Sequence, residues 1–372
     1  MRTATRSALP GPPASALSLA GKASPPPRAA PDNGGRGTLH PQLGVAIRAE
    51  SAPASLRRVV TWYFAHVYGV REGPGVVPFY CDPQRVGRFA VKPEALAAGR
   101  DDALFRLFVG LSMYQARRDV VIMQQQRTMT AGVVASLSSS RRLRQLVASS
   151  ACDRLASAAV FDAGCDVAKE SGGIDCRHRP GLACHVKEAT AELRRMGDSG
   201  KLPTSAWLNG WKDGGLRPML DEVFEATPDP VRRADLVVER FERVYRVGRK
   251  LATMFVGAIS APVLAPGLAP WFPAVDGHSL VVVDTHIVRT LDRLRPASTP
   301  RSYEARSTWV KRQAARLDLR EFHAGVPSYA PRLVQQALYH FGSKSNRVHA
   351  RDACAGRTTP CGECVVRLCP FA

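Results

Sequence analysis

The sequence predicts an all-α protein, and three observations support that fold class. From Ser55 onward, apolar residues recur three and four positions apart, which is typical of helices with one buried face. The one strand-like run, 281–283, is too short to seed a sheet and leads directly into another helical pattern. With 372 residues, 45% of them apolar, the chain can form sizeable cores in about two domains, which excludes wholesale disorder.

The first two helices follow from this spacing. Apolar residues at helical intervals predict a helix near 55–70. Asp101 or Asp102 is suited to cap the second helix, because aspartate accepts hydrogen bonds from the free N–H groups of a first helical turn. The buried face of that helix would consist of Leu104, Phe105, Leu107, Phe108 and Leu111.

Three further helices are expected toward the C-terminus. Asp229 and Pro230 form an N-cap and first-turn pair, since proline fits where a helix needs no N–H donor. The apolar pattern at Ile287, Leu291 and Leu294 predicts a helix after the strand-like run. Residues 329–341 are expected to form a last long helix.

The first 52 residues differ in composition from the rest. They hold eight prolines and no sustained apolar period, so they cannot bury enough surface to offset chain entropy and are expected to be disordered. An organelle transit peptide, a short secretory core at 16–20, a featureless tail and a misplaced start codon are alternative interpretations. Most of the positive charge lies on the remaining residues.

Charge and cysteine content restrict the function further. Lys and Arg number 52 against 32 Asp and Glu, a formal net charge of +20, which favours a polyanionic partner such as nucleic acid. The sequence has no run of about 18 apolar residues, so no membrane partner is expected. A secreted disulfide scaffold fits poorly, because the nine cysteines are odd in number and four crowd near the C-terminus.

Those four cysteines predict a metal centre. Cys354, Cys361, Cys364 and Cys369 are separated by six, two and four residues. Four thiolates in so short a segment can converge on one soft centre, either an iron–sulfur cluster or a tetrahedral zinc ion. Two disulfides are the remaining alternative, disfavoured in a reducing compartment. The spacing alone favours cluster and zinc equally.

Four blocks of the chain resemble, in order, the endonuclease III group of helix-hairpin-helix DNA glycosylases. The cysteine spacing matches the 4Fe-4S loop of that group, with a last gap shorter by one residue. Residues 247–252 are similar to the hairpin followed by the lysine helix, and 283–287 to the segment with the catalytic aspartate. Residues 111–116 resemble, more weakly, the helix whose glutamine faces DNA.

The resemblance implies a bilobal helix-hairpin-helix glycosylase fold with a C-terminal iron–sulfur cluster loop. After the tail, 1–52, a discontinuous cluster-bearing domain would combine 53–102 with 284–372. The hairpin-bearing domain would span 103–283. The active cleft is expected between the two domains, and the protein is expected to be a cytoplasmic, nucleoid-associated monomer whose partner is double-stranded DNA.

The resemblance also assigns the catalytic roles. Lys250 would attack the sugar C1′ as a neutral amine and form a Schiff base, after which the strand can be cut by β-elimination. Asp284 would stabilise developing positive charge on the sugar or assist proton transfer. Its position before Thr-His-Ile also suits a helix N-cap, and one residue can fill both roles. The expected activity is excision of a modified or mismatched base from duplex DNA.

DNA binding and metal binding are assigned in the same way. Arg246, Val247, Gly248 and Arg249 would offer backbone N–H groups and charge to a phosphate at a helix N-terminus. Gln115 would enter the gap that an extruded base leaves in the duplex. The four C-terminal cysteines would bind the 4Fe-4S cluster, with zinc as the alternative.

Three departures from the family pattern leave a rival function open. Arg246 stands where the family hairpin has a glycine, which would ease a tight turn and phosphate approach. A proline-rich stretch, 261–276, lengthens the gap between the lysine and the aspartate, and a segment near 162–207 has no family counterpart. The rival is a catalytically inactive iron–sulfur or zinc DNA-binding protein on the same scaffold.

The remaining cysteines give a weaker signal. The spacing of Cys165, Cys176 and Cys184, with His185 next to the last, could suit a small zinc site, although free buried cysteines explain it as well. Cys81 and Cys152 give no signal of their own.

Overall fold

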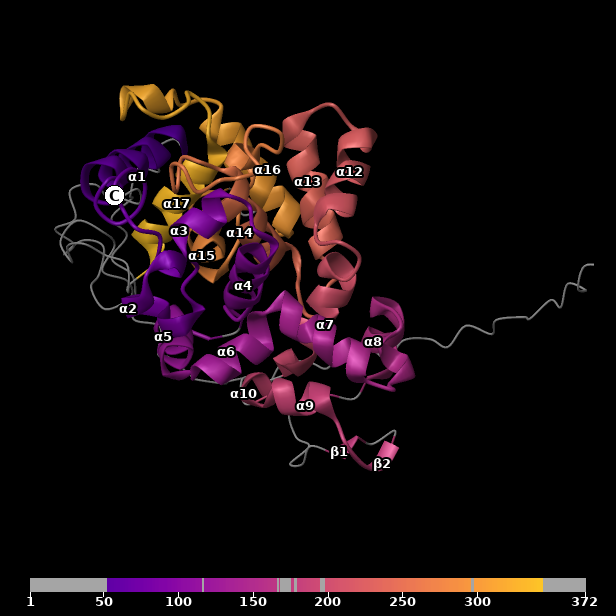
Figure 1. Ribbon diagram of the computed structural model, residues 1–372. Helices are drawn as coiled ribbons and strands as arrows, with labels where there is room; N and C mark the ends of the chain where they lie inside the picture. The colour runs from indigo at the N-terminus through magenta and orange to yellow at the C-terminus, as the bar shows by residue number, and fades with distance from the viewer. Residues whose placement is uncertain are drawn as a thin grey trace, which may run out of the picture. The chain divides into compact units, whose positions relative to one another are not determined.

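The computed structural model describes residues 52–115, 117–165, 167, 175–176, 179–194, 198–295 and 298–343. Within these ranges the chain is helical apart from one two-stranded sheet (Figure 1), which confirms the all-α expectation. No helix there is both long enough and apolar enough to cross a membrane. The expected disordered tail and the four C-terminal cysteines lie outside the described residues, save for Ala52.

The helices before the sheet are mostly short. They are α1 (Ala52–His66), α2 (Pro83–Val86), α3 (Pro93–Ala97), α4 (Asp101–Ser112), α5 (Asp119–Thr128), α6 (Ala131–Ser138), α7 (Ser140–Ser149) and α8 (Ala158–Gly164).

The sheet and the later helices complete the chain. They are β1 (Asp175–Cys176), β2 (Arg179–Ala183), α9 (His185–Ala189), α10 (Ala191–Arg194), α11 (Leu202–Ala206), α12 (Arg217–Ala226), α13 (Pro230–Phe241), α14 (Arg249–Ser260), α15 (Thr285–Leu294), α16 (Tyr303–Ala314) and α17 (Pro331–Gly342).

Local signals located some helix ends and missed others. Asp229 caps α13 as expected, and its carboxylate accepts a hydrogen bond from the Val231 N–H at 3.0 Å. The expectation that Asp101 or Asp102 caps α4 is wrong, because Arg100 is the capping residue and both aspartates lie in the first turn. The Asp101 carboxylate instead accepts from the Leu216 N–H, 3.5 Å away, so tertiary packing decided its partner.

Two other differences concern strands. The strand-like run 281–283 is a buried, extended connection that leads into α15 and pairs with no neighbour in a sheet. The β1–β2 hairpin, by contrast, lies in a stretch for which the sequence predicted no strand. Both runs are too short for hydrophobic alternation to identify them.

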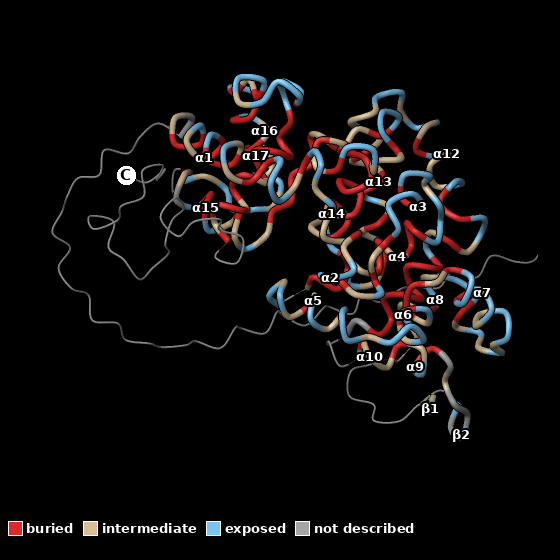
Figure 2. Tube along the Cα trace, turned by 60° about the vertical axis from the view of Figure 1, so that its left-hand side comes forward, coloured by how far each residue is buried: buried red, intermediate tan, exposed pale blue. Residues whose placement is uncertain are grey.

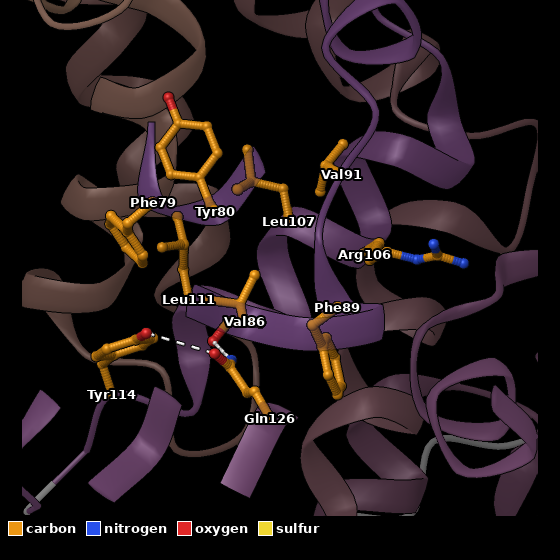
Figure 3. Close-up of a pocket in the computed structure, with 11 residues that line it drawn as sticks. Phe79, Tyr80, Val86, Phe89, Val91, Arg106, Leu107, Leu111, Tyr114 and Gln126 are labelled. Atoms are coloured by element: carbon orange, nitrogen blue, oxygen red, sulfur yellow. Dashed lines mark hydrogen bonds between the residues drawn. The ribbon is translucent and has the colours of Figure 1, made fainter. Parts of the chain in front are cut away.

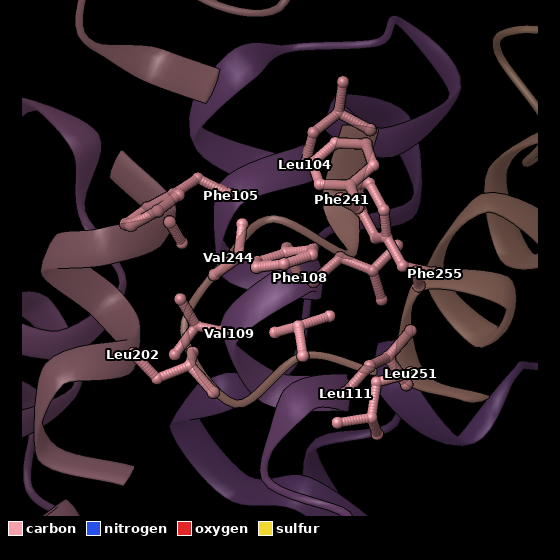
Figure 4. Packing of buried hydrophobic residues seen from close by; sticks show 14 of the residues in the cluster. Leu104, Phe105, Phe108, Val109, Leu111, Leu202, Phe241, Val244, Leu251 and Phe255 are labelled. Carbon is pink, nitrogen blue, oxygen red and sulfur yellow. The ribbon is translucent and has the colours of Figure 1, made fainter. Parts of the chain in front are cut away.

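The first hydrophobic cluster is centred on α4, α13 and α14. The rings of Phe108 of α4, Phe241 and Phe255 contact one another, with centroids 5.0 Å from Phe108 to each of the others and 4.9 Å between Phe241 and Phe255 (Figure 4). Trp211 closes the group at 5.6 Å from Phe108. These contacts fix the two helices of the hairpin against α4, which leads into the Gln115 segment.

A second hydrophobic cluster is formed by α1, α15, α16 and α17. The Trp62 and Phe341 rings meet edge to face, 5.6 Å apart. Figure 2 shows the two groups of buried residues, with α14 and α15 in different groups. Residues 81–96 contribute to the first cluster. The expected domain spanning 103–283 stays a prediction. The candidate functional site lies where helices of the two clusters meet.

Candidate functional site

The turn between α13 and α14 has the left-handed backbone that the family glycine would supply. Arg246 has φ of +62°, and no other non-glycine residue of the described chain has a positive φ. The cost of this conformation for an L-residue is about 1–2 kcal/mol. The side chain is exposed, and its guanidinium carbon lies 5.7 Å from the Tyr245 ring centroid.

The first amides of α14 are open to a ligand. Gly248 is the N-cap and offers no side-chain hydrogen bond, while its carbonyl accepts from the N–H groups of Leu251 and Ala252. Within the described chain, the N–H groups of Gly248, Arg249 and Lys250 donate to no protein acceptor. A Cβ added at Gly248 would meet no atom within 4 Å, so a phosphate can approach this backbone closely.

The Arg249 guanidinium, in contrast, is turned toward the hairpin. It pairs with Asp235 of α13 at 3.3 Å and with Glu242 at 3.1 Å, and all three side chains are partly buried. Arg249 therefore ties the two hairpin helices together through its side chain. Only the Arg249 backbone N–H remains available to the expected phosphate site. Sequence spacing could not distinguish the role of this N–H from that of the side chain.

Lys250 and the Gln115 segment meet in the structure. The Lys250 Nζ atom donates a hydrogen bond to the Tyr114 carbonyl oxygen at 3.0 Å, across 136 positions of sequence. The lysine is half-buried, and the Gln115 side chain donates to the Ser112 carbonyl at 2.7 Å, directly after α4 ends. The resemblance assigned Lys250 and Gln115 to one active site. In the structure, Lys250 binds the carbonyl of the peptide group that joins Tyr114 to Gln115.

Asp284 is held rigidly at the start of α15. Its carboxylate accepts a hydrogen bond from the Ile287 N–H at 2.8 Å, which confirms the expected N-cap. The residue is half-buried. A capped carboxylate loses little further freedom when it acts on a substrate.

Tyr303 connects the start of α15 to the lysine helix. Its hydroxyl donates to the Val281 carbonyl at 2.8 Å, accepts from the Val283 N–H at 3.3 Å and lies 3.5 Å from the Thr253 hydroxyl. Burial raises the pKa of Tyr303, so the hydroxyl remains a donor at neutral pH. Thr253 follows Lys250 by three positions, so both lie on the same face of α14. The residue before Asp284 is therefore fixed to the helix face that bears Lys250.

A second connection joins α17 to the segment after Gln115. The Tyr339 hydroxyl donates to the Asp119 carboxylate at 2.6 Å, and Asp119 begins α5. The Tyr339 ring also meets the His286 ring edge on, with centroids 5.8 Å apart. His286 lies two positions after Asp284, so α15, α17 and the start of α5 are held together beside the site.

The cavity next to Tyr114 is too small for a nucleobase. Its volume is about 10 Å³, roughly that of one water, and aromatic and aliphatic side chains line it (Figure 3). The Tyr114 hydroxyl donates to the Gln126 amide oxygen at 3.4 Å, and the Gln126 amide nitrogen donates to the Gly110 carbonyl at 2.9 Å.

A larger cavity, of about 460 Å³, lies elsewhere in the first cluster. It is framed by α3, α4 and α7, and it contains neither Lys250 nor Asp284. Its charged lining residues are Lys92, Arg100, Asp101, Asp102, Arg106, Arg141 and Arg144. The sequence did not identify this site, because its residues come from segments that are far apart and become neighbours only by packing.

The segment without a family counterpart supports the hairpin. Ser205 accepts a hydrogen bond from the Tyr245 N–H at 2.9 Å and donates to the Asp162 carboxylate at 2.9 Å. Lys201 donates to the Asp162 carbonyl at 2.8 Å, and its Nζ atom lies 4.8 Å from the Tyr245 ring centroid. These contacts fix the residue before Arg246, and no motif in the sequence indicated them.

The structure thus joins Lys250 to the residue before Gln115, and joins the residue before Asp284 through Tyr303 to Thr253 of the lysine helix. That Lys250 and Asp284 act together stays a prediction. Cys354, Cys361, Cys364 and Cys369 lie outside the described residues. Within the described ranges, no three His, Cys, Asp or Glu side chains already surround a point where a metal ion would sit. Compared with known proteins, the chain matches no family model, no curated protein and no solved structure.

Proposed function

We propose that this protein is a DNA glycosylase with AP lyase activity, which removes a modified or mismatched base from duplex DNA. The observation that carries the proposal is the hydrogen bond from Lys250 to Tyr114, because it unites the lysine helix with the Gln115 segment. Asp284, whose neighbour Val283 is linked through Tyr303 to Thr253 of the lysine helix, would supply the carboxylate. The partner is double-stranded DNA, bound by a monomer in the cytoplasm.

In this proposal the hairpin binds a phosphate and the base is rotated out of the duplex. The open N–H groups of Gly248, Arg249 and Lys250 would donate to phosphate oxygens, while the Arg249 side chain holds the hairpin closed. Gln115 would fill the vacated stack. Because the net charge is +20, counterion release adds to this binding.

The chemical step requires Lys250 to leave the Tyr114 carbonyl. Its amine nitrogen would bond to the sugar C1′ as the bond from C1′ to the base breaks, and the base would leave with that electron pair and gain a proton. Asp284 would stabilise the positive charge that develops on the sugar. The C1′–O4′ bond would then break, with O4′ gaining a proton and the nitrogen having lost one, to give the ring-opened Schiff base. Loss of a C2′ proton from this Schiff base would expel the 3′ phosphate.

The metal group belongs to the same proposal. Cys354, Cys361, Cys364 and Cys369 would hold a 4Fe-4S cluster, with zinc as the alternative, and four thiolates are the donor set that either requires. When bound, it would supply a cross-link that orders the C-terminal loop. The base-excision steps above use only side chains of the described chain.

Borohydride trapping tests the chemistry directly. The wild-type protein, incubated with a duplex carrying an abasic site or one lesion from a defined panel, is expected to form a covalent adduct on reduction. Lys250→Gln should form none, whereas Lys311→Gln, a matched change of another half-buried helical lysine, should form as much as wild type. No adduct and no excision by wild type, or an adduct with Lys250→Gln, would contradict the proposal. Retained duplex binding without chemistry would then favour the inactive DNA-binding protein.

A further inference from the structure

The larger cavity of the first cluster gathers positive charge. Its volume of about 460 Å³ falls within the range of small-molecule sites, about 300–1,000 Å³. Five cationic side chains and two carboxylates line it, which leaves a net charge of +3. The cations are those of Lys92, Arg100, Arg106, Arg141 and Arg144. They come from the residues just before α3 and α4, the middle of α4 and the first half of α7.

These five cations have no carboxylate partners in the described chain. None of their side chains forms a hydrogen bond or an ion pair with a described residue. Arginines elsewhere do pair, such as Arg240 with Glu222 at 2.7 Å and Arg306 with Asp292 at 2.8 Å. Cations that gather around one space repel each other, and a bound anion would remove that repulsion. The cavity therefore favours an anionic ligand.

The two carboxylates of the lining belong to the first turn of α4. The Asp101 carboxylate accepts from the Leu216 N–H at 3.5 Å, and a Cβ added at Gly215 would lie 2.1 Å from its Oδ2 atom. Asp101 is therefore packed against the backbone of 215–216. Asp102 is exposed and has no hydrogen-bond partner among the described residues. Its carboxylate remains available to a hydroxyl or amino group of a ligand.

The start of α7 adds donors to the lining. Ser140 and Arg141 are its first two residues, and their N–H groups donate to no acceptor of the described chain. The next N–H, of Arg142, donates to the Ser139 hydroxyl at 3.2 Å. Ser140 is only 7% exposed, and its hydroxyl accepts from the Trp207 indole at 3.2 Å while its own proton meets no described acceptor. Phosphate oxygens are suited to such free donors at a helix start.

Arginines of two helices contribute to the same space. Arg141 and Arg144 are three positions apart, so they lie on one face of α7. Arg106 belongs to α4, which packs against α7, and its side chain extends away from the small cavity beside Tyr114 (Figure 3). The Arg106 Nε atom is buried and donates to no acceptor of the described chain. A planar guanidinium offers paired N–H donors that match phosphate oxygens, so both helices present phosphate-binding groups.

We propose that this cavity binds a nucleoside 5′-monophosphate group, either as a free nucleotide or as the 5′-phosphorylated end of a DNA strand. The phosphate would accept hydrogen bonds from the first N–H groups of α7 and from the Arg106 and Arg144 guanidiniums. A sugar hydroxyl or a base amino group would donate to Asp102. The volume exceeds what a bare phosphate fills, and a concave site admits a terminal phosphate more readily than the middle of a duplex.

The bound group would connect α7 to α4 and stabilise the folded chain by binding. Neither Lys250 nor Asp284 lines the cavity, so this binding does not rest on the proposed glycosylase activity. A failed adduct experiment would leave the nucleotide result unaffected. In the same way, loss of nucleotide binding in a cavity variant should leave adduct formation unchanged.

Titration calorimetry and thermal unfolding of the full chain test the site. AMP, GMP, CMP and UMP are compared with adenosine, which lacks the phosphate. At least one monophosphate should bind at one per chain and raise the unfolding temperature, and adenosine should do neither. Arg144→Gln should weaken that binding at least about 10-fold, because a charge-assisted hydrogen bond is lost. Arg142→Gln is the matched control, an exposed arginine of α7 outside the cavity, and should bind as wild type.

Duplexes with a 5′ phosphate or a 5′ hydroxyl separate the two sources. If only the phosphorylated duplex binds more tightly and loses this gain in Arg144→Gln, the group is a strand end; binding of free monophosphates identifies a nucleotide. Without ligand, Arg144→Gln should unfold at a temperature no lower than wild type, since glutamine keeps the helix and the change reduces repulsion. The proposal is overturned if neither probe depends on Arg144, or if Arg142→Gln weakens binding equally.

Discussion

The backbone at Arg246 gives a prediction with a defined sign. This residue has φ of +62°, where a Cβ atom crowds the following carbonyl and glycine has no such penalty. We therefore compare Arg246→Gly with Arg246→Ala. Both variants remove the guanidinium and its contact with the Tyr245 ring, and only glycine relieves the backbone strain.

The expected difference follows from two opposing terms. Relief of the left-handed conformation stabilises the glycine variant by about 1–2 kcal/mol relative to alanine. Glycine also gains conformational entropy in the unfolded chain, which costs about 0.5–1 kcal/mol. The glycine variant should therefore be more stable than the alanine variant, by about 1 kcal/mol in the free energy of unfolding.

Urea unfolding of the two variants measures this difference, and an ordinary helical position supplies the control. Arg144 is exposed in the middle of α7, where alanine should be more stable than glycine by about 1 kcal/mol. The order of the two variants should thus reverse between positions 144 and 246. If alanine were as stable as glycine at position 246, the left-handed conformation of Arg246 would be wrong.

Two further predictions concern the supports of the site. Tyr303→Phe should lower the free energy of unfolding by about 1–3 kcal/mol, because the Val281 carbonyl and the Val283 N–H lose their buried partner. A urea unfolding curve that matches wild type would contradict the connection between α15 and α14. Burial raises the pKa of Cys165 from 9.0 to about 11, so the neutral thiol contributes stability that is complete below pH 9 and is lost as pH rises to about 11. The wild-type protein should therefore lose more stability over that interval than Cys165→Ser, and parallel curves of stability against pH from thermal unfolding would refute this.

Features decided within one turn of chain could be predicted from the sequence. The caps at Asp229 and Asp284 were predicted correctly because the acceptor and its N–H donor lie two or three residues apart. Asp101 carried the same local signal, but the N–H of Leu216, more than a hundred positions away, took its carboxylate. Capping propensity alone cannot foresee that competition, since it depends on which segments pack together.

The candidate site shows the same limit in its charges. Arg249 was assigned to phosphate binding from its place in a motif, and its side chain instead pairs with two carboxylates of the hairpin. The spacing of residues along the chain does not show which side chains will pack beside a given charge.

The left-handed conformation of Arg246 can be explained by the way the turn between α13 and α14 is anchored. A non-glycine residue persists in a left-handed conformation only where its surroundings over-determine the turn. Here the turn is bound on one side by Ser205, which accepts from Tyr245, and on the other by Arg249, which pairs with Asp235 and Glu242. Ser205 belongs to the segment near 162–207, so this segment supplies an anchor that makes the arginine tolerable. Removing that anchor with Ser205→Ala should therefore cost less in a protein that already carries Arg246→Gly than in wild type, because the strain it opposes is gone.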